Sequence, residues 1–278
     1  MAFDDFEVST DEGESIALYE FRWGSVYWRY TSADRAITYP EGSENVYQAV
    51  SIMDNGMTQG GSDQNDFTIT LQSNLPIVNL FKGTPPSSTI WVTVRRRHRD
   101  DPDDEAAVWW IGRVANVKRL ENQAEAEARC ISLLSMFKRG GLRLTWGRNC
   151  PHVVYDSQCR VAAALHEYER TILEVTTTTV KITVATTPVE GTFTGGYVEW
   201  DRGGGGTLER RGIEEMISDT EVRIFGKTDG LAPGDTIWLY PGCNRTAEVC
   251  QNGFGNIANN GGFRFMPGDS PFTGATVF

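Results

Sequence analysis

The sequence lacks any long apolar segment. No run of about 18 apolar residues occurs among its 278 residues, so nothing predicts a membrane span. The first 13 residues are polar and acidic, without the apolar core of a secretion signal. Basic residues are outnumbered, with 26 Lys and Arg against 37 Asp and Glu and a formal net charge of −11. This balance argues against sequence-specific or phosphate-neutralising binding of nucleic acid, which needs a basic surface.

Histidine and cysteine are scarce, with three and five residues respectively. Without a secretion signal, the cysteines predict a reducing compartment, in which cysteine pairs ligate a metal or a cluster more often than they form disulfides. Aromatic residues are plentiful (8 Trp, 9 Tyr and 13 Phe), and 29 Gly accompany many Thr and Val. This composition favours strands and turns over helices, so the sequence predicts a mainly β protein with few short helices.

Short β-type runs follow one another along the chain. Residues 66–72 alternate strictly between apolar and polar, and Trp23-Gly24 separates two runs that predict a hairpin. Helical patterns are confined to residues 75–83, with Asn74 as the expected cap, and to residues 161–168, for which a strand is the alternative. Residues 121–128 are expected to form a charged spacer. Strands are predicted at residues 16–21, 25–30, 66–72, 88–94, 107–114, 193–200, 212–217, 221–225 and 235–240, and residues 173–185 predict either one long strand or a hairpin.

A run of charge, RRRHRDDPDDE, occupies residues 95–105 and changes from basic to acidic. Its basic half could form a nucleic-acid patch. The alternative is a solvated hairpin loop whose two halves pair with each other. We favour the second interpretation because the whole chain is acidic.

Four of the five cysteines form two local pairs, Cys150-x8-Cys159 and Cys243-x6-Cys250, which 83 residues separate. Zinc knuckles use narrower spacings such as C-x2-C, which let two sulfurs ligate one small ion. The wider loops favour a larger group, and a [4Fe-4S] cubane held by four thiolates suits them. Zinc, or a disulfide within each loop, remains an alternative from the spacing alone. Cys130 lies in an apolar run and is expected to be a small buried residue.

His152 lies two residues from Cys150 and raises a different hypothesis, a thiol hydrolase with Cys150 as its nucleophile. Such a dyad needs a base from a separate element and a third group that orients it. None of the three histidines has that setting in the sequence, so we do not expect an enzyme. A zinc- or disulfide-stabilised binding module is the other alternative.

The C-terminal half resembles a known family. The pattern C-x8-C, then PGC-x6-C, then F-x-N…N-x-GGF…PG over about residues 142–268 is similar to the tail tip and hub proteins of long-tailed phages, of the lambda tail tip and gene transfer agent hub types. The N-terminal half is compatible with them in pattern.

The resemblance implies a virion protein of a siphophage, assembled in the bacterial host cytoplasm. It implies a homotrimeric ring at the distal end of the tail tube, which adapts the tube to a tip complex and lets DNA pass during genome ejection. Its partners would be distal tail and tail tube proteins and a central tip fibre. A [4Fe-4S] cluster on Cys150, Cys159, Cys243 and Cys250 is also implied. We therefore expect two β-rich domains, a tube-like barrel or sandwich over residues 1–141 and a cysteine-bearing domain over residues 142–278.

Overall fold

The computed structural model describes residues 15–56, 67–99, 101, 103–121, 124–133, 135, 146–183, 187–202 and 207–266. The chain divides into two compact units. The first unit is Met1–Arg139 with Gly203–Glu209, and the second is Gly140–Arg202 with Arg210–Phe278. Residues 141 and 142, between which the sequence predicts a domain boundary, lie outside the described residues, and that boundary stays a prediction.

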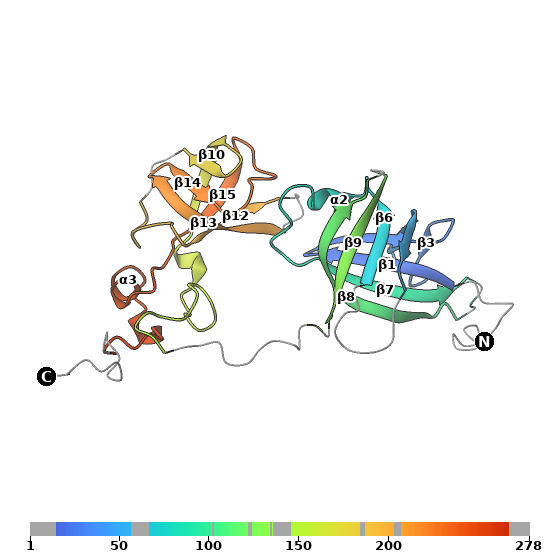
Figure 1. The fold of residues 1–278 in the computed structure, drawn as a ribbon, viewed down its shortest axis with the longest axis horizontal. Coiled ribbons are helices and arrows are strands. Elements are labelled where there is room, and N and C mark those ends of the chain that lie inside the picture. The colour runs from blue at the N-terminus through green and yellow to red at the C-terminus, as the bar shows by residue number, and fades with distance from the viewer. Residues whose placement is uncertain are drawn as a thin grey trace. The chain divides into compact units, whose positions relative to one another are not determined.

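One large sheet forms the first unit (Figure 1). Its nine described strands follow the order β3-β4-β2-β1-β7-β8-β9-β6-β5, and all neighbours except β2 and β4 are antiparallel where their register is described. The strands are β1 (Ser15–Trp23), β2 (Val26–Thr31), β3 (Ile37–Thr38), β4 (Val46–Ala49), β5 (Ile52–Asp54), β6 (Phe67–Gln72), β7 (Trp91–His98), β8 (Ala106–Arg119) and β9 (Glu125–Ser132).

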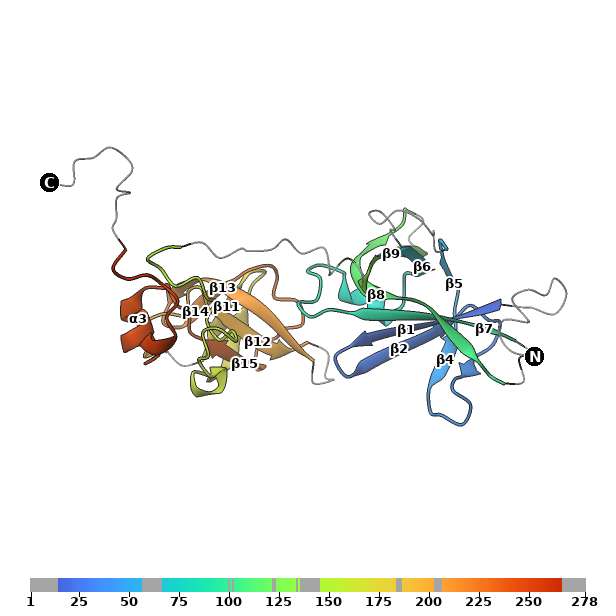
Figure 2. The same cartoon turned by 90° about the horizontal axis from the view of Figure 1, so that it is seen from below.

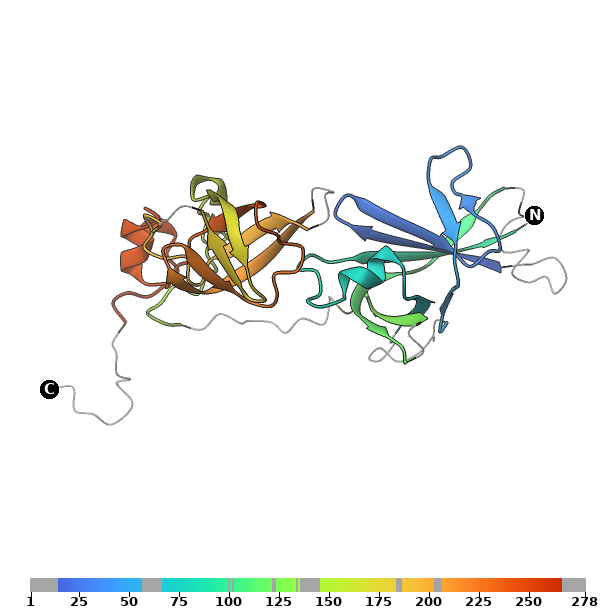
Figure 3. The same cartoon turned by 90° about the horizontal axis from the view of Figure 1, so that it is seen from above.

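The hairpin and the alternating strand that the sequence predicts in this unit are both present. Trp23 pairs with Val26 at the end of the predicted β1–β2 hairpin, and Gly24 adopts a positive φ of 58° in the turn. Strand β6 alternates buried and half-buried residues as predicted, which directs Phe67, Ile69 and Leu71 into the core. The short helix α2 (Pro76–Leu80) lies beside the strands of this unit (Figure 3). Its buried Ile77 and Val78 belong to that core.

Two local predictions for the first unit are wrong. The cap of α2 is Leu75 and not Asn74, because Pro76 fixes the first helical turn and no side chain caps it. The charged spacer at residues 121–128 is also wrong, since Glu125–Ser132 form β9. Its alternate residues Ala126 and Ala128 are fully buried, while charged residues occupy the other face. The small size of alanine concealed this alternation in the sequence.

A closed six-stranded barrel, in the order β10-β11-β14-β13-β12-β15, forms the body of the second unit. Ile172, Val180, Phe193, Trp200 and Leu239 are among the residues of its core. Residues 173–183 belong to the β10–β11 hairpin, one of the two forms expected for residues 173–185, and residues 184 and 185 lie outside the described residues. The strands are β10 (Tyr168–Val175), β11 (Thr179–Ile182), β12 (Tyr197–Asp201), β13 (Leu208–Ser218), β14 (Glu221–Ile224) and β15 (Thr236–Tyr240).

The predicted mainly β class is confirmed, and helices are short throughout the described residues. Residues 161–168 form only the 3-10 turn η2 (Ala163–Leu165) before β10 begins, so a helix there was a wrong expectation. Helix α3 (Ala247–Asn252) and the 3-10 turn η3 (Ile257–Asn259) follow the barrel, and α3 lies outside it (Figure 2). No helix among the described residues is long and apolar enough to cross a membrane.

The buried position of Cys130 predicts an unreactive thiol. The residue is fully buried in β9, and burial raises the pKa of its thiol to about 12. Its thiolate fraction at pH 8 is therefore roughly a thousandfold below that of an exposed cysteine. Iodoacetamide treatment followed by peptide mass mapping should find Cys130 unmodified in the folded chain and modified in urea. Equal labelling rates in the two states would contradict this placement.

Candidate functional site

The barrel brings the two cysteine loops to the same edge. The first loop precedes β10 and the second follows β15, and these two strands pair antiparallel. Tyr168 at the start of β10 lies opposite Leu239, next to the end of β15. Because the first residues of one strand meet the last residues of the other, both loops leave the barrel at one end. Two segments that are distant in sequence thus become neighbours.

The first loop, residues 150–159, is folded around one carboxylate. Asp156 accepts hydrogen bonds from the backbone N–H groups of Val153, Gln158 and Cys159. Burial by itself would raise the pKa of Asp156, but these three donors lower it below its usual value. The ionised carboxylate therefore holds the turn that presents Cys159.

The second loop, residues 243–250, runs directly into α3. Thr246 caps this helix by accepting a hydrogen bond from Val249 N, so Cys250 lies in the helix and is buried. Arg245 adopts a positive φ of 67°, and its N–H donates to Cys243 Sγ over 3.3 Å. The backbone immediately before Cys243 packs without space for a side chain, since a Cβ on Gly242 would lie 1.9 Å from Thr194 O.

Direct hydrogen bonds join the two loops. Cys150 N donates to Arg245 O over 2.9 Å. Asn256, which follows the second loop, donates its amide Nδ2 to Cys159 O over 2.6 Å. Gly261 N completes the set by donating to Cys150 Sγ over 3.4 Å. Residues from both predicted cysteine pairs and from the asparagine- and glycine-rich tail therefore form one lobe beside the barrel.

The Cys243 thiol lies within electrostatic range of the other three thiols of this lobe. The pKa of the Cys243 thiol is raised, first by burial and then by the negative charge that Cys250, Cys159 and Cys150 would carry as thiolates. The N–H of Arg245 acts in the opposite direction. The structure thus gathers all four cysteines that the sequence singles out, and leaves Cys130 in the core of the first unit.

An aromatic cluster packs between the lobe and the barrel. Tyr155, at the centre of the first loop, makes edge contacts with Tyr197, Tyr240 and Phe254, with ring centroids 5.7–6.1 Å apart. Its hydroxyl donates to Pro241 O over 3.0 Å. Burial raises the pKa of Tyr155, so the ring remains neutral and keeps this donor. The cluster connects the first loop to the barrel strands β12 and β15 and to Phe254, which follows α3.

All five cysteines are free thiols, and among the described residues no group of three or more His, Cys, Asp or Glu is arranged to hold a single metal ion. His152 packs its ring against Gly261, where an added Cβ would lie 2.4 Å from Nε2. Within the described part of the chain, Cys150 Sγ accepts from Gly261 N and not from His152. The histidine therefore fills space beside the thiol lobe, and no Cys150–His152 dyad is formed.

The basic run in the first unit is compensated by carboxylates. Residues 95–98 belong to β7, so the expectation that the whole run is a loop is wrong. Pairing across the turn is confirmed for Arg97 and Asp104, whose nearest charged atoms are 2.5 Å apart. One guanidinium nitrogen of Arg96 donates to both carboxylate oxygens of Asp54, over 2.9 Å to Oδ1 and 2.7 Å to Oδ2.

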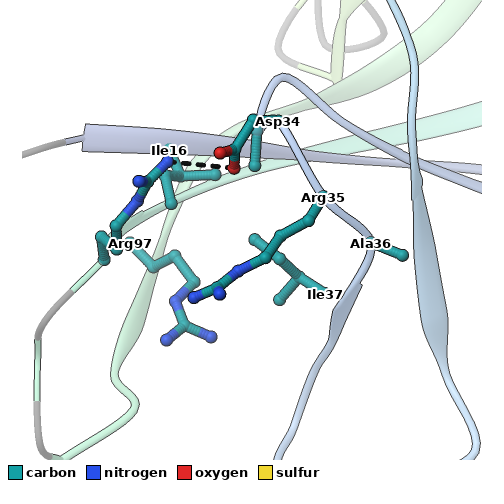
Figure 4. Close-up of a pocket in the computed structure, with 8 residues that line it drawn as sticks. Ile16, Asp34, Arg35, Ala36, Ile37 and Arg97 are labelled. Atoms are coloured by element: carbon teal, nitrogen blue, oxygen red, sulfur yellow. Dashed lines mark hydrogen bonds and ion pairs between the residues drawn. The ribbon is translucent and has the colours of Figure 1, made fainter.

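Figure 4 shows the end of this run at a surface pocket of about 200 Å³. Arg99 pairs there with Asp34, and the guanidinium groups of Arg35 and Arg97 approach the same space. The pocket belongs to the first unit and contains no cysteine. With Arg96, Arg97 and Arg99 each paired to a carboxylate, the run does not form the unopposed basic patch that phosphate binding requires.

Sequence reasoning missed the residues that connect the thiols. Asn256 and Tyr155 carry no chemistry typical of a metal ligand, and their roles depend on partners from the other loop. Helix α3 was also missed, although Thr246 and Gly253 bracket it as a cap and a terminus do. At six residues, it is too short for a periodic pattern to show.

The tight packing before Cys243 yields a prediction about stability. Gly242→Ala should lower the free energy of unfolding by about 3 kcal/mol or more, because its Cβ would overlap backbone atoms that cannot move aside. Gly147→Ala is the matched control in the same unit, since no atom lies within 4 Å of its added Cβ. Urea titration of the full chain measures both. Equal midpoints for Gly242→Ala and the unsubstituted chain would show that the packing is not as tight as described.

Comparison with known proteins identifies the family. Residues 19–162 match the family described as baseplate hub protein, N-terminal attachment domain, and residues 191–270 match one described as a phage conserved hypothetical protein. A chain from the structure titled "Virion of native gene transfer agent (GTA) particle" has a TM-score of 0.75 at 16% identity, covering 96% of this chain and 93% of that one. No curated protein matches. Because the hub match spans more than half of the sequence, the chain belongs to the phage baseplate hub protein family and is a component of the virion.

Proposed function

We propose that this protein is a structural component of a phage tail tip, a ring at the distal end of the tail tube that is stabilised by a four-cysteine [4Fe-4S] cluster. Membership of the baseplate hub family supports the location at the tail. The single observation that supports the proposed cluster is that two cysteine loops distant in sequence meet in one hydrogen-bonded lobe. The ligands are Cys150, Cys159, Cys243 and Cys250.

The surroundings of the sulfurs fit such a group. N–H donors from Arg245 and Gly261 lie 3.3 and 3.4 Å from Cys243 Sγ and Cys150 Sγ, and Asn256 Nδ2 lies 3.7 Å from Cys159 Sγ. Such donors stabilise the negative charge that thiolates carry and tune an iron–sulfur group. When bound, the cluster would supply four metal–sulfur bonds that link loops 83 residues apart. That link contributes folding free energy, as structural metal sites do.

The proposed ring is a homotrimer that joins the tail tube and distal tail proteins to the tip complex and its central fibre. The nine-stranded sheet of the first unit supplies a rigid body for such a ring, and all of it except the first residues of β1 lies within the segment that matches the attachment domain. The net charge of −11 suits a passage for DNA, because like charges limit adsorption of the phosphate backbone. The protein's role is assembly, and we assign it no catalytic step.

Iron and acid-labile sulfide test the cluster. Protein purified without air should contain about four of each per chain, with broad visible absorbance. Replacing any one of the four ligands by serine should remove most of the iron and the absorbance. Cys130→Ala is the control and should retain both, because Cys130 lies in the other unit's core. Stoichiometric zinc instead of iron, or two disulfides under denaturing thiol counting, would overturn the cluster in favour of the corresponding alternative.

The oligomeric state tests the ring. Light scattering coupled to size-exclusion chromatography should give three chains per particle for the purified full-length protein, with three-fold symmetry in averaged electron micrographs. A monomer at every accessible concentration, or a ring of another order, would contradict the trimer. This measurement does not depend on the metal content, so the two parts of the proposal can fail separately.

A further inference from the structure

One residue outside the four cysteines contacts both halves of the thiol site, Cys159 through its side chain and Cys250 through its backbone. Asn256 lies in the tail beyond α3 and is half-buried. Its Nδ2 donates to Cys159 O over 2.6 Å and lies 3.7 Å from Cys159 Sγ. Its backbone N–H donates to Cys250 O over 2.8 Å, a bond that does not depend on the protonation of the Cys250 sulfur. Cys159 and Cys250 belong to different loops, so Asn256 bridges them.

The orientation of the Asn256 amide is fixed by its partners. A backbone carbonyl can only accept, so the atom that faces Cys159 O must be the NH₂ group. The amide oxygen then faces Asn259 Nδ2, which donates to it over 2.6 Å. The NH₂ group has two hydrogens, one for Cys159 O and one directed toward Cys159 Sγ. Among side chains of this size, only asparagine supplies two donors and an acceptor in one plane.

We propose that Asn256 is the positioning residue of the four-thiol site, which holds the two cysteine loops in register and supplies an N–H donor to the Cys159 thiolate. The inference rests on the proposed [4Fe-4S] cluster and adds a residue that is not a ligand. Loss of this residue should therefore loosen the site and also change the electronic properties of the bound group. A residue that acted only through folding would change stability alone.

The test is Asn256→Asp. The substitution keeps the shape of the side chain but replaces the NH₂ group with a second acceptor that carries negative charge against Cys159 O and Sγ. The control is Asn244→Asp, which makes the same change one residue from Cys243. Within the described residues, the Asn244 amide oxygen accepts from Thr246 N and Oγ1 and its NH₂ group makes no hydrogen bond, so an aspartate retains both bonds.

Two measurements on the anaerobic full-length protein separate the outcomes. Iron release to a chelator should be about 10–100-fold faster in Asn256→Asp than in the unsubstituted chain, the usual cost of removing an outer partner of a metal ligand. The midpoint reduction potential should fall, because a lost N–H donor and an added negative charge both disfavour the more negative reduced cluster. Asn244→Asp should match the unsubstituted chain in release rate and shift the potential less.

An Asn256→Asp protein that holds its cluster with unchanged release rate and potential overturns this inference and leaves the proposed function standing. Absence of iron from the unsubstituted chain overturns both. If Asn256→Asp does not fold, Asn259→Ala replaces it, because that change removes only the donor that braces the Asn256 amide oxygen. Release several-fold faster in Asn259→Ala supports the inference, and release at the unsubstituted rate overturns it.

Discussion

The pairing of β10 with β15 is the constraint on which the thiol lobe depends. Each of these strands adjoins one cysteine loop, and their antiparallel register brings both loops to one end of the barrel. Closure of a barrel is a non-local event, since strands far apart in sequence must meet before either loop finds its partner. The hydrogen bonds between Cys150 and Arg245 and between Asn256 and Cys159 then fix the loops against each other. A group that bonds all four sulfurs would reinforce a contact that the polypeptide has already made.

Among the described residues, none of the buried apolar clusters includes a residue of the lobe. Its stability comes from the aromatic cluster around Tyr155, from tight backbone packing at Gly242 and from hydrogen bonds that satisfy the loop backbone. This kind of structure is typical of small regions that cannot bury enough apolar surface and need a covalent or metal link. The first unit has the opposite character. Its sheet buries a large aromatic and aliphatic core, and there Cys130 is a packing residue.

The two units also differ in how they compensate charge. In the first unit, the basic run along β7 is neutralised by carboxylates from the turn and from neighbouring elements, such as Asp54 at the end of β5. In the second, the four sulfurs would concentrate negative charge, and backbone and amide N–H groups face three of them. Neutral donors suit this purpose, because they stabilise thiolates without placing a competing positive side chain in the lobe.

The sequence by itself determined the mainly β class, the β1–β2 hairpin, the alternation of β6 and the buried character of Cys130, because each depends on neighbours within one or two strands. It also singled out the four cysteines and, through the pattern of the tail, the phage hub family. Only the tertiary structure decided that Cys159 and Cys250 share one asparagine, that His152 packs on a glycine and that β9 replaces a charged spacer. These features depend on partners brought together by barrel closure and strand order. Local sequence patterns do not predict these features, because spacing along the chain does not specify which distant segments become adjacent.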